Sequence, residues 1–284
     1  MNWTGAGSAA DACSAADPGH VRNQPDNGEK EEDSVTTAAP QRVALITGAG
    51  QGIGRATAER LAEDGLAVVV GDRDADLATR TASSITDLGG TARPLVLDVT
   101  DRVAVREAVA AVVADTGRLD VVVNNAMWIR YKPLGEFTED DVDGMLAVGL
   151  KATMWTMQAA IEPMTAQGGG VIVNMSSPAA NRGIPGSAVY SAVKGAVSSL
   201  TRQAAIELGP LGIRVNAVVP GAVPTEGARA VVDDAGYELR RQMSPLGRLA
   251  TPQDIAAGVA WLVSEDAAYV TGHHLAVDGG LLSV

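Results

Sequence analysis

From Arg42 to its end, the chain alternates short runs of Val, Ile and Leu with longer Ala-rich amphipathic stretches. The apolar runs lie at 43–47, 66–71, 93–98, 119–124, 170–175, 213–219 and 273–277. Most are apolar on both faces, which is typical of buried parallel strands. The stretches with helical pattern lie near 52–65, 74–88, 101–117, 138–167, 188–209 and 252–264. This repeated alternation predicts an α/β fold, a doubly wound seven-stranded parallel sheet with helices on both faces.

The first 41 residues have a different composition. They hold seven acidic residues, two basic residues and no apolar periodicity, so they bury too little apolar surface to offset the entropy of ordering. We expect 1–41 to be a disordered acidic tail, either without function or serving as an interaction segment. Residues 42–284 are then a single domain, although about 150 residues per domain suggests two for 284 residues.

Composition excludes several classes of protein. Lys and Arg number 22 against 34 Asp and Glu, a net charge of −12, which argues against a nucleic-acid partner. The single cysteine, Cys13, excludes a disulfide framework or a cysteine-rich zinc site. No apolar run is long enough to span a membrane, and no signal peptide is visible, so we expect a cytoplasmic protein. His273 and His274 have no acidic or Cys neighbours at metal-ligand spacing, and we predict no metal site.

A glycine-rich turn follows the first apolar run and leads into the first helical stretch. It reads Thr47-Gly48-Ala49-Gly50-Gln51-Gly52-Ile53-Gly54. Glycines at these positions permit a tight turn and close approach of a pyrophosphate, which then lies at a helix N-terminus. The turn lacks a Gly-Lys-Ser/Thr ending and is not an ATP-type phosphate loop. It predicts dinucleotide binding by a Rossmann fold, with contacts from Gly48, Gln51, Gly52, Ile53 and Gly54.

The end of the second apolar run bears on the choice of dinucleotide. Asp72 lies near the spacing expected for a carboxylate that binds the adenosine ribose, and it would repel a 2′-phosphate. Gln51 adds no positive charge. Arg73 complicates the choice, because its guanidinium could receive a 2′-phosphate, stack on the adenine or point to solvent. We favour NAD over NADP.

A second group of residues suits hydride-transfer chemistry. Tyr190 and Lys194 are four apart in a helical stretch, so they share a face, and Ser177 follows the fifth apolar run. An unperturbed tyrosine pKa near 10 is too high for an efficient base, but a neighbouring ammonium and a cationic nicotinamide favour the phenolate. Tyr190 would then exchange a proton with an alcohol or carbonyl, Ser177 would hydrogen-bond the substrate oxygen, and Lys194 would also hold the nicotinamide ribose.

These features together resemble the short-chain dehydrogenase/reductase family over essentially all of 42–284. The matching motifs are Thr47-Gly48-x-x-x-Gly52-x-Gly54, Asp98, Asn124-Asn125-Ala126, Ser177, Tyr190-x-x-x-Lys194, Pro220-Gly221 with Thr225, Tyr269-Val-Thr-Gly272 and Val277-Asp-Gly-Gly280. The resemblance implies that Asp98 and Val99 meet the adenine and that Asn125 and Ala126 line the cofactor ribose. It also implies that Val223 and Thr225 contact the carboxamide and phosphate, and that the long helices near 138–167 and 188–209 build a homotetramer.

Two positions depart from the family pattern. Gly149 stands where the family usually has an Asn in a kinked helix that holds a water for proton relay to the lysine. Glycine cannot supply the amide but permits a helix distortion. We hypothesise that a water on backbone carbonyls near Gly149 substitutes. The other departure is Met127, where the family commonly has Gly, and it is expected to narrow the pocket near the nicotinamide.

The substrate pocket is expected to come from 127–135, 178–187 and 222–248. The last of these mixes Gly, Ala and charged residues, as a mobile lid does. The candidate apolar lining is Trp128, Ile129, Tyr131, Pro178, Ile184 and Met243. Arg130, Lys132 and Arg182 could meet an acidic substituent, although a solvated role is the better expectation.

The leading prediction is an NAD-dependent oxidoreductase that interconverts a secondary alcohol and its ketone, with a small-molecule substrate as its partner. An NADPH-dependent 3-oxoacyl carrier-protein reductase is the alternative enzyme, and Asp72 counts against it. A dinucleotide-sensing or scaffold protein is the alternative outside enzymes. Gly149 gives that alternative some support, whereas Ser177, Tyr190 and Lys194 argue against it.

Overall fold

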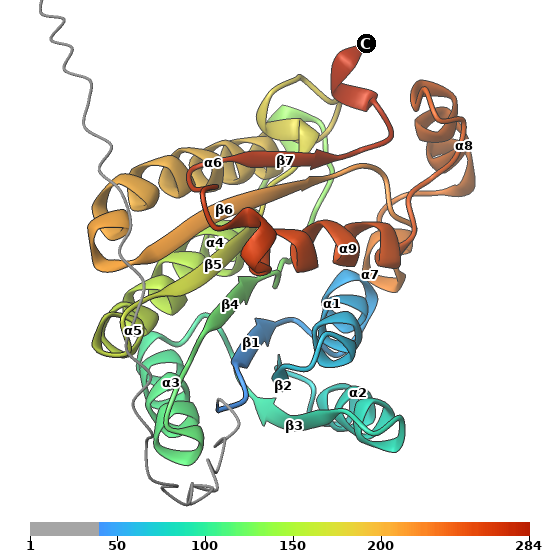
Figure 1. Ribbon diagram of the computed structural model, residues 1–284. Helices are drawn as coiled ribbons and strands as arrows, with labels where there is room; N and C mark the ends of the chain where they lie inside the picture. Colours follow the sequence, from blue (N-terminus) through green and yellow to red (C-terminus); the bar gives the residue numbers. More distant parts are fainter. Residues whose placement is uncertain (1–39) are drawn as a thin grey trace, which may run out of the picture. The chain divides into compact units, whose positions relative to one another are not determined.

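A computed structural model describes residues 40–284 of the chain. These residues contain one sheet of seven parallel strands in the order β3-β2-β1-β4-β5-β6-β7, which confirms the predicted fold class (Figure 1). The strands are β1 Val43–Thr47, β2 Ala67–Asp72, β3 Thr91–Val96, β4 Val121–Asn124, β5 Gly170–Met175, β6 Ile213–Pro220 and β7 His274–Val277.

Helices cover both faces of this sheet. One face carries α1 Gly52–Glu63, α2 Ala75–Asp87 and α9 Pro252–Val263, and the other carries α3 Arg102–Thr116, α5 Ala152–Ala166 and α6 Ala188–Leu208. Helix α4 Glu139–Leu146 runs into α5 through a π-helical turn, Ala147–Lys151. The short α7 Glu226–Arg229 and α8 Asp234–Met243 lie beyond the ends of the strands (Figure 1).

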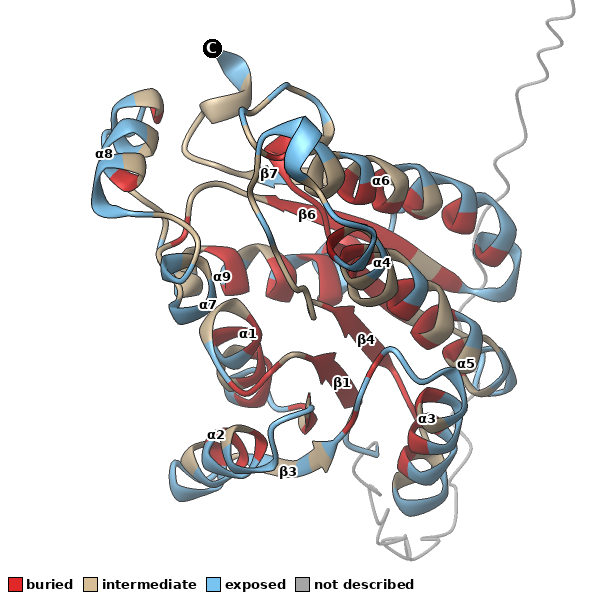
Figure 2. Cartoon of the chain, turned by 180° about the vertical axis from the view of Figure 1, so that it is seen from behind, coloured by how far each residue is buried: buried red, intermediate tan, exposed pale blue. Residues whose placement is uncertain are grey.

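The core is aliphatic and lies on both sides of the sheet. All five residues of β1 are buried, and they alternate between the two faces. Ala44 and Ile46 pack with α1, α2 and α9, whereas Val43 and Leu45 pack with α3, α5 and α6. A central strand covered on both faces must be apolar throughout, which is the pattern the sequence shows. The edge strand β3 is only partly covered (Figure 2).

The helix beginnings differ in a way that bears on function. Most long helices start with a side chain that accepts a first-turn N–H: Asp74 in α2, Asp101 in α3, Thr138 in α4, Asp233 in α8 and Thr251 in α9. Gln51, at the start of α1, makes no such side-chain bond. The first-turn N–H groups of α1 therefore stay available to an anion.

Four of the sequence predictions can be compared with this fold. The single helical stretch expected near 138–167 is interrupted by the π-helical turn. The expected lid, 222–248, contains two helices that its mixed composition did not reveal. The expected tail, including Cys13, lies outside the described residues except for 40 and 41. No helix in the described range is long and apolar enough to cross a membrane, and the cytoplasmic location stays a prediction.

Candidate active site

The candidate site forms at the carboxyl ends of β1 and β4, where the direction of the strand order reverses. Such a switch point leaves a crevice outside the sheet, because the loops on its two sides diverge. Here the loops are joined by hydrogen bonds. The Thr47 hydroxyl accepts the backbone N–H groups of Asn125 (3.1 Å) and Ala126 (3.2 Å). The Asn125 amide donates to the carbonyl oxygens of Thr47 and Gly48, both at 2.9 Å.

The glycine-rich loop is packed so closely that side chains would not fit. A Cβ on Gly54 would lie 2.2 Å from the Gly48 carbonyl oxygen, and a Cβ on Gly48 would lie 2.9 Å from the Ala126 Cα. Thr225 lies over the loop, with its Cβ 3.1 Å from a Cβ built at Gly52. This brings the uncapped start of α1, the β4 end and the segment after β6 together, an arrangement that fits a dinucleotide pyrophosphate.

Asp72 and its neighbours lie at the next strand end. The half-buried Asp72 carboxylate accepts the N–H of Gly50 at 2.9 Å and that of Asp74 at 3.1 Å, so it also positions the loop. Arg73 is exposed, and its charge helps lower the pKa of Asp98, after two larger contributions from hydrogen bonds with Thr100.

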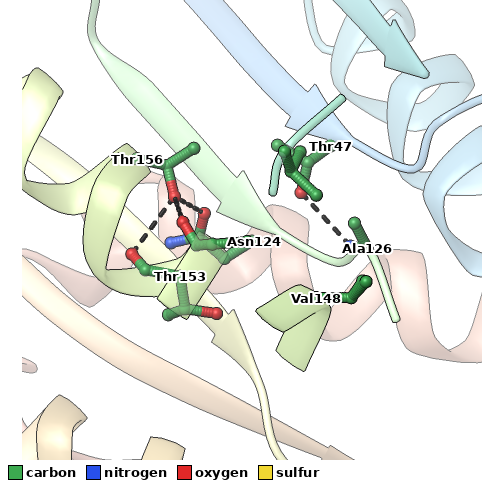
Figure 3. A pocket seen from close by; sticks show the side chains of 8 residues that line it. Thr47, Asn124, Ala126, Val148, Thr153 and Thr156 are labelled. Carbon is green, nitrogen blue, oxygen red and sulfur yellow. Dashed lines mark hydrogen bonds between the residues drawn. The ribbon is translucent and has the colours of Figure 1, made fainter. Parts of the chain in front are cut away.

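A narrow pocket lies behind these strand ends, lined by Thr47, Val99, Asn124, Ala126, Val148, Ala152, Thr153 and Thr156 (Figure 3). Its inner wall is a buried polar network. The Asn124 amide donates to Asn174 Oδ1 at 2.8 Å, and Asn174 donates to the Thr201 hydroxyl at 3.0 Å. Asn124 also accepts a hydrogen bond from the Thr156 hydroxyl. Asn174, Thr156 and Thr201 were not predicted, because they come from three separate elements and meet only in the folded structure.

The structure brings Ser177, Tyr190 and Lys194 together beyond the end of β5. Ser177 and Lys194 are buried, with 7% and 4% of their surface exposed. The Lys194 ammonium donates to the Met175 carbonyl at 2.7 Å and lies 5.8 Å from the centroid of the Tyr190 ring. Burial raises the pKa of Tyr190, the nearby Tyr131 phenol raises it further, and a hydrogen bond with Ser177 lowers it. Burial lowers the pKa of Lys194 to about 8.

The two departures from the family pattern prove to be in contact. A Cβ on Gly149 would lie 2.8 Å from the Met127 sulfur and 2.5 Å from Val193 Cγ1. The Gly149 carbonyl accepts the Thr153 hydroxyl at 3.0 Å. The expected helix distortion is present as the π-helical turn. Met127 therefore fills part of the space beside Gly149, and a side chain at 149 would overlap both Met127 and Val193. The hypothesis of a substituting water stays a prediction.

The three basic residues considered for an acidic substituent have other contacts. Lys132 forms an ion pair with Asp141 at 2.6 Å, and its backbone N–H donates a hydrogen bond to the Gly186 carbonyl at 2.9 Å. Arg182 donates to the Leu281 carbonyl at 3.0 Å, and the exposed Arg130 lies over the Trp128 ring. The contact between Lys132 and Gly186 places two of the predicted pocket segments, 127–135 and 178–187, side by side.

Among the predicted apolar lining residues, Tyr131 contacts the catalytic Tyr190, and Pro178 directly follows Ser177. The Tyr131 ring meets Tyr190 edge to face, with centroids 5.9 Å apart. The Trp128 ring instead packs on α4, because a Cβ on Gly144 would lie 2.5 Å from it. His274 contacts the Ser198 carbonyl at 3.1 Å, and burial lowers the pKa of its imidazole. Within the described range, no group of acidic, His or Cys residues has the arrangement of a metal site.

Comparison with known proteins identifies the family. Residues 48–282 match a family model described as Enoyl-(Acyl carrier protein) reductase. The chain is 41% identical over 256 residues to a short-chain reductase protein, NovJ, from Streptomyces niveus, covering 87% of this chain and 97% of that protein. The chain belongs to the short-chain dehydrogenase/reductase family.

Solved structures of similar proteins carry both forms of the cofactor. A gluconate 5-dehydrogenase from Burkholderia cenocepacia, in complex with NADP and tartrate, is 37% identical with a TM-score of 0.82, covering 86% of this chain and 96% of that one. A 3-ketoacyl-(acyl-carrier-protein) reductase from Brucella melitensis, complexed with NADH, is 34% identical with a TM-score of 0.80. The match covers 85% of this chain and 98% of that one. This short-chain dehydrogenase/reductase is therefore an oxidoreductase that acts on CH–OH groups with a nicotinamide dinucleotide.

Proposed function

We propose that this short-chain dehydrogenase/reductase uses NAD to interconvert a secondary alcohol and its ketone, with Tyr190 as the general acid/base. The observation that carries the proposal is the group formed beyond the end of β5 by the buried Ser177 and Lys194 and the half-buried Tyr190. The nicotinamide dinucleotide supplies the hydride acceptor or donor when it is bound. The protein must then supply a proton acceptor or donor at the substrate oxygen.

Each residue of the group has a distinct chemical task. A tyrosine phenol is ordinarily neutral at pH 7, and burial raises the pKa of Tyr190 further, so Tyr190 is ready to give a proton to a ketone oxygen. In the oxidative direction it accepts the alcohol proton, and the nearby Lys194 ammonium stabilises the phenolate that reacts. The bond from Lys194 to the Met175 carbonyl fixes the position of that ammonium. Ser177 hydrogen-bonds the same oxygen and orients the substrate.

The choice of NAD rests on Asp72. Its carboxylate is held in place by the backbone of the glycine loop and repels a 2′-phosphate on the adenosine ribose. Arg73 is exposed, and its charge contributes to lowering the pKa of Asp98. Gly48, Gln51, Gly52, Ile53 and Gly54 are proposed to contact the pyrophosphate, together with Val223 and Thr225. Asp98, Val99, Asn125 and Ala126 are proposed to line the adenosine and ribose.

We also propose that the protein works as a homotetramer built on the two long helices α5 and α6. Ile206 of α6, with 76% of its surface exposed, supports this interface, and the C-terminal Val284, with 77% exposed, supports a second interface at 281–284. Light scattering on the purified protein measures the number of subunits, and a monomer would overturn this part of the proposal.

The test is a panel of cyclic, aliphatic and sugar alcohols, and of the matching ketones and 3-oxoacyl thioesters, with both cofactors. We expect turnover of secondary alcohols with NAD. Tyr190→Phe should lower kcat by about 10²–10⁴-fold, the usual contribution of a positioned acid or base. Tyr269→Phe, the same change at a fully exposed tyrosine, is the control.

Two results would overturn the proposal. Preferred turnover of 3-oxoacyl thioesters with NADPH would support the carrier-protein reductase. No turnover of any substrate by the wild type, with NADH binding unchanged in Tyr190→Phe, would support a sensing or scaffold protein.

A further inference from the structure

The loop 178–187 connects Ser177 to the start of α6 and is one of the three segments expected to form the substrate pocket. Within residues 40–284 it makes two hydrogen bonds to distant parts of the chain. One comes from the backbone N–H of Lys132, and the other runs from the Arg182 guanidinium to the Leu281 carbonyl at 3.0 Å. Few hydrogen bonds therefore fix this loop against the rest of the pocket.

The partner of Arg182 belongs to a turn that follows β7, residues 278–284 (the C-terminal turn). The Asp278 carboxylate accepts the backbone N–H groups of Gly280 at 2.9 Å and of Leu282 at 2.8 Å. Asp side chains stabilise turns through local bonds of this kind. Figure 1 shows the C-terminal turn between α8 and the loop that precedes α6. The turn is thus an ordered element beside two of the pocket segments.

The C-terminal turn also holds the end of the stretch 222–248. The Gly279 carbonyl accepts the Ser244 hydroxyl at 3.3 Å and the Leu246 N–H at 3.2 Å. Gly279 has a φ of +65°, and a Cβ there would lie 2.5 Å from the Ser244 oxygen, so this close contact requires glycine. The C-terminal turn is therefore bonded to 222–248 on one side and to Arg182 on the other.

We propose that Arg182 is a positioning residue, which holds the loop 178–187 to the C-terminal turn and so sets its distance from 222–248 across the substrate pocket. The inference rests on the proposed function and adds to it a residue that governs substrate specificity. Since Lys132 joins the same loop to 127–135, the three pocket segments are connected in one series.

The bond from Arg182 to Leu281 is strong enough to restrain the loop. The Arg182 side chain is half-buried and forms no ion pair with any residue of the described range, so the Leu281 carbonyl holds the guanidinium. A charged donor makes this bond stronger than one between neutral groups. A loop that is held in its binding conformation before the substrate arrives loses less entropy on binding. Loss of the bond should therefore weaken substrate binding and leave the proton and hydride transfer nearly unchanged.

The first test measures the oxidation of cyclohexanol and of 4-tert-butylcyclohexanol with NAD. Arg182→Gln should raise the KM for cyclohexanol by about three- to tenfold, the effect of one hydrogen bond, and should leave kcat and the KM for NAD within about twofold of the wild type. A wider pocket favours the bulkier alcohol, so the ratio of kcat/KM for cyclohexanol over the 4-tert-butyl compound should fall. Arg182→Lys keeps a charged donor and should restore most of the affinity for cyclohexanol. Arg80→Gln, at an exposed position of α2, is the control and should change none of these values.

Deletion of 281–284 removes the acceptor and gives a second test. The deletion should raise the KM for cyclohexanol as Arg182→Gln does. In the shortened chain, Arg182→Gln should then raise this KM by less than about twofold more, because the bond is already absent. Both proteins of that comparison lack the same residues, so any effect of the deletion on assembly is common to both. A full further rise in KM would show that Arg182 acts without the C-terminal turn, as a direct contact with the substrate would, and would overturn the proposal.

Hydrogen exchange of the backbone amides in 178–187 tests the restraint without substrate. Arg182→Gln should speed exchange in this loop, and Arg80→Gln should not. Unchanged exchange in 178–187, or a lower kcat with an unchanged KM for cyclohexanol, would overturn the proposal. If the wild type oxidises no secondary alcohol, the proposed function fails, and hydrogen exchange alone then decides whether Arg182 holds the loop.

Discussion

Gly149→Ala tests whether the π-helical turn depends on the absence of a side chain at 149. The added Cβ would lie 2.5 Å from Val193 Cγ1 and 2.8 Å from the Met127 sulfur. Ordinary carbon contacts are about 3.5–4.0 Å, so the Cβ overlaps Val193 by about 1 Å. Met127 is unbranched and can turn aside, whereas the β-branched and fully buried Val193 cannot.

The expected magnitude is the difference of two effects. Overpacking costs about 1–3 kcal/mol, and the better helix propensity of Ala over Gly returns about 1 kcal/mol. The free energy of unfolding should therefore fall by about 1 kcal/mol. In a Val193→Ala background the clashing methyl is gone. The same Gly149→Ala change should then raise the free energy of unfolding by about 0.5–1 kcal/mol. The coupling energy is then about 2 kcal/mol.

The assay is urea unfolding of the wild type, Gly149→Ala, Val193→Ala and the double variant, without cofactor and at one protein concentration. Gly195→Ala in α6 is the matched control, because a Cβ there meets no atom within 4 Å, and it should stabilise by about 0.5–1 kcal/mol. Since Val193 directly precedes Lys194, Gly149→Ala should also lower kcat, by up to about 10²-fold for a 1 Å displacement. If Gly149→Ala stabilises as much as Gly195→Ala, or the coupling is within about 0.5 kcal/mol of zero, the steric reasoning is refuted.

Two further predictions concern the charged residues of the site. Asp72→Asn keeps an acceptor for the Gly50 N–H but removes the negative charge, so the ratio of kcat/KM with NADP to that with NAD should rise by about tenfold or more. The control Asp74→Asn should leave this ratio unchanged. Equal ratios in the two variants would refute the role of Asp72. For Lys194 the folded pKa of about 8 lies below the usual 10.5, so the unfolded chain binds more protons between these values and stability rises with pH there. Urea unfolding without cofactor should show that the free energy of unfolding rises by about 1–2 kcal/mol from pH 8 to 9.5, and Lys194→Met should abolish this rise. The same rise in the variant would contradict this assignment.

The sequence was a good guide wherever the constraint was local. Hydrophobic runs of strand length predicted the seven strands within about two residues at each end. The glycine turn predicted a dinucleotide site, and the resemblance to the family implied that Asn125 and Ala126 line the cofactor ribose. The spacing of Tyr190 and Lys194 placed them on one face of α6. The structure joins Asn125 to the glycine loop, and it brings Ser177 close to Tyr190 and Lys194.

The sequence was a poor guide to α8 and to the surroundings of Gly149. The stretch 222–248 has the composition of a loop, and α8 carries only one buried residue, Tyr237, so its apolar signal is weak. Gly149 and Met127 looked like two separate departures from the family pattern. They are one packing feature, since the side chain of one fills the space left by the other.

The sequence by itself determined the doubly wound sheet and the order of strands and helices along the chain. It also determined the strand ends at which a dinucleotide could bind and a hydride-transfer group could assemble. These follow from the periodicity of apolar residues and from glycine, which act over a few neighbouring positions. Only the tertiary structure decided which distant side chains meet: Asn124 with Asn174, Gly149 with Met127 and Val193, and Tyr131 with Tyr190. Such contacts depend on how separate elements pack in three dimensions, and a single sequence carries no local signal of them.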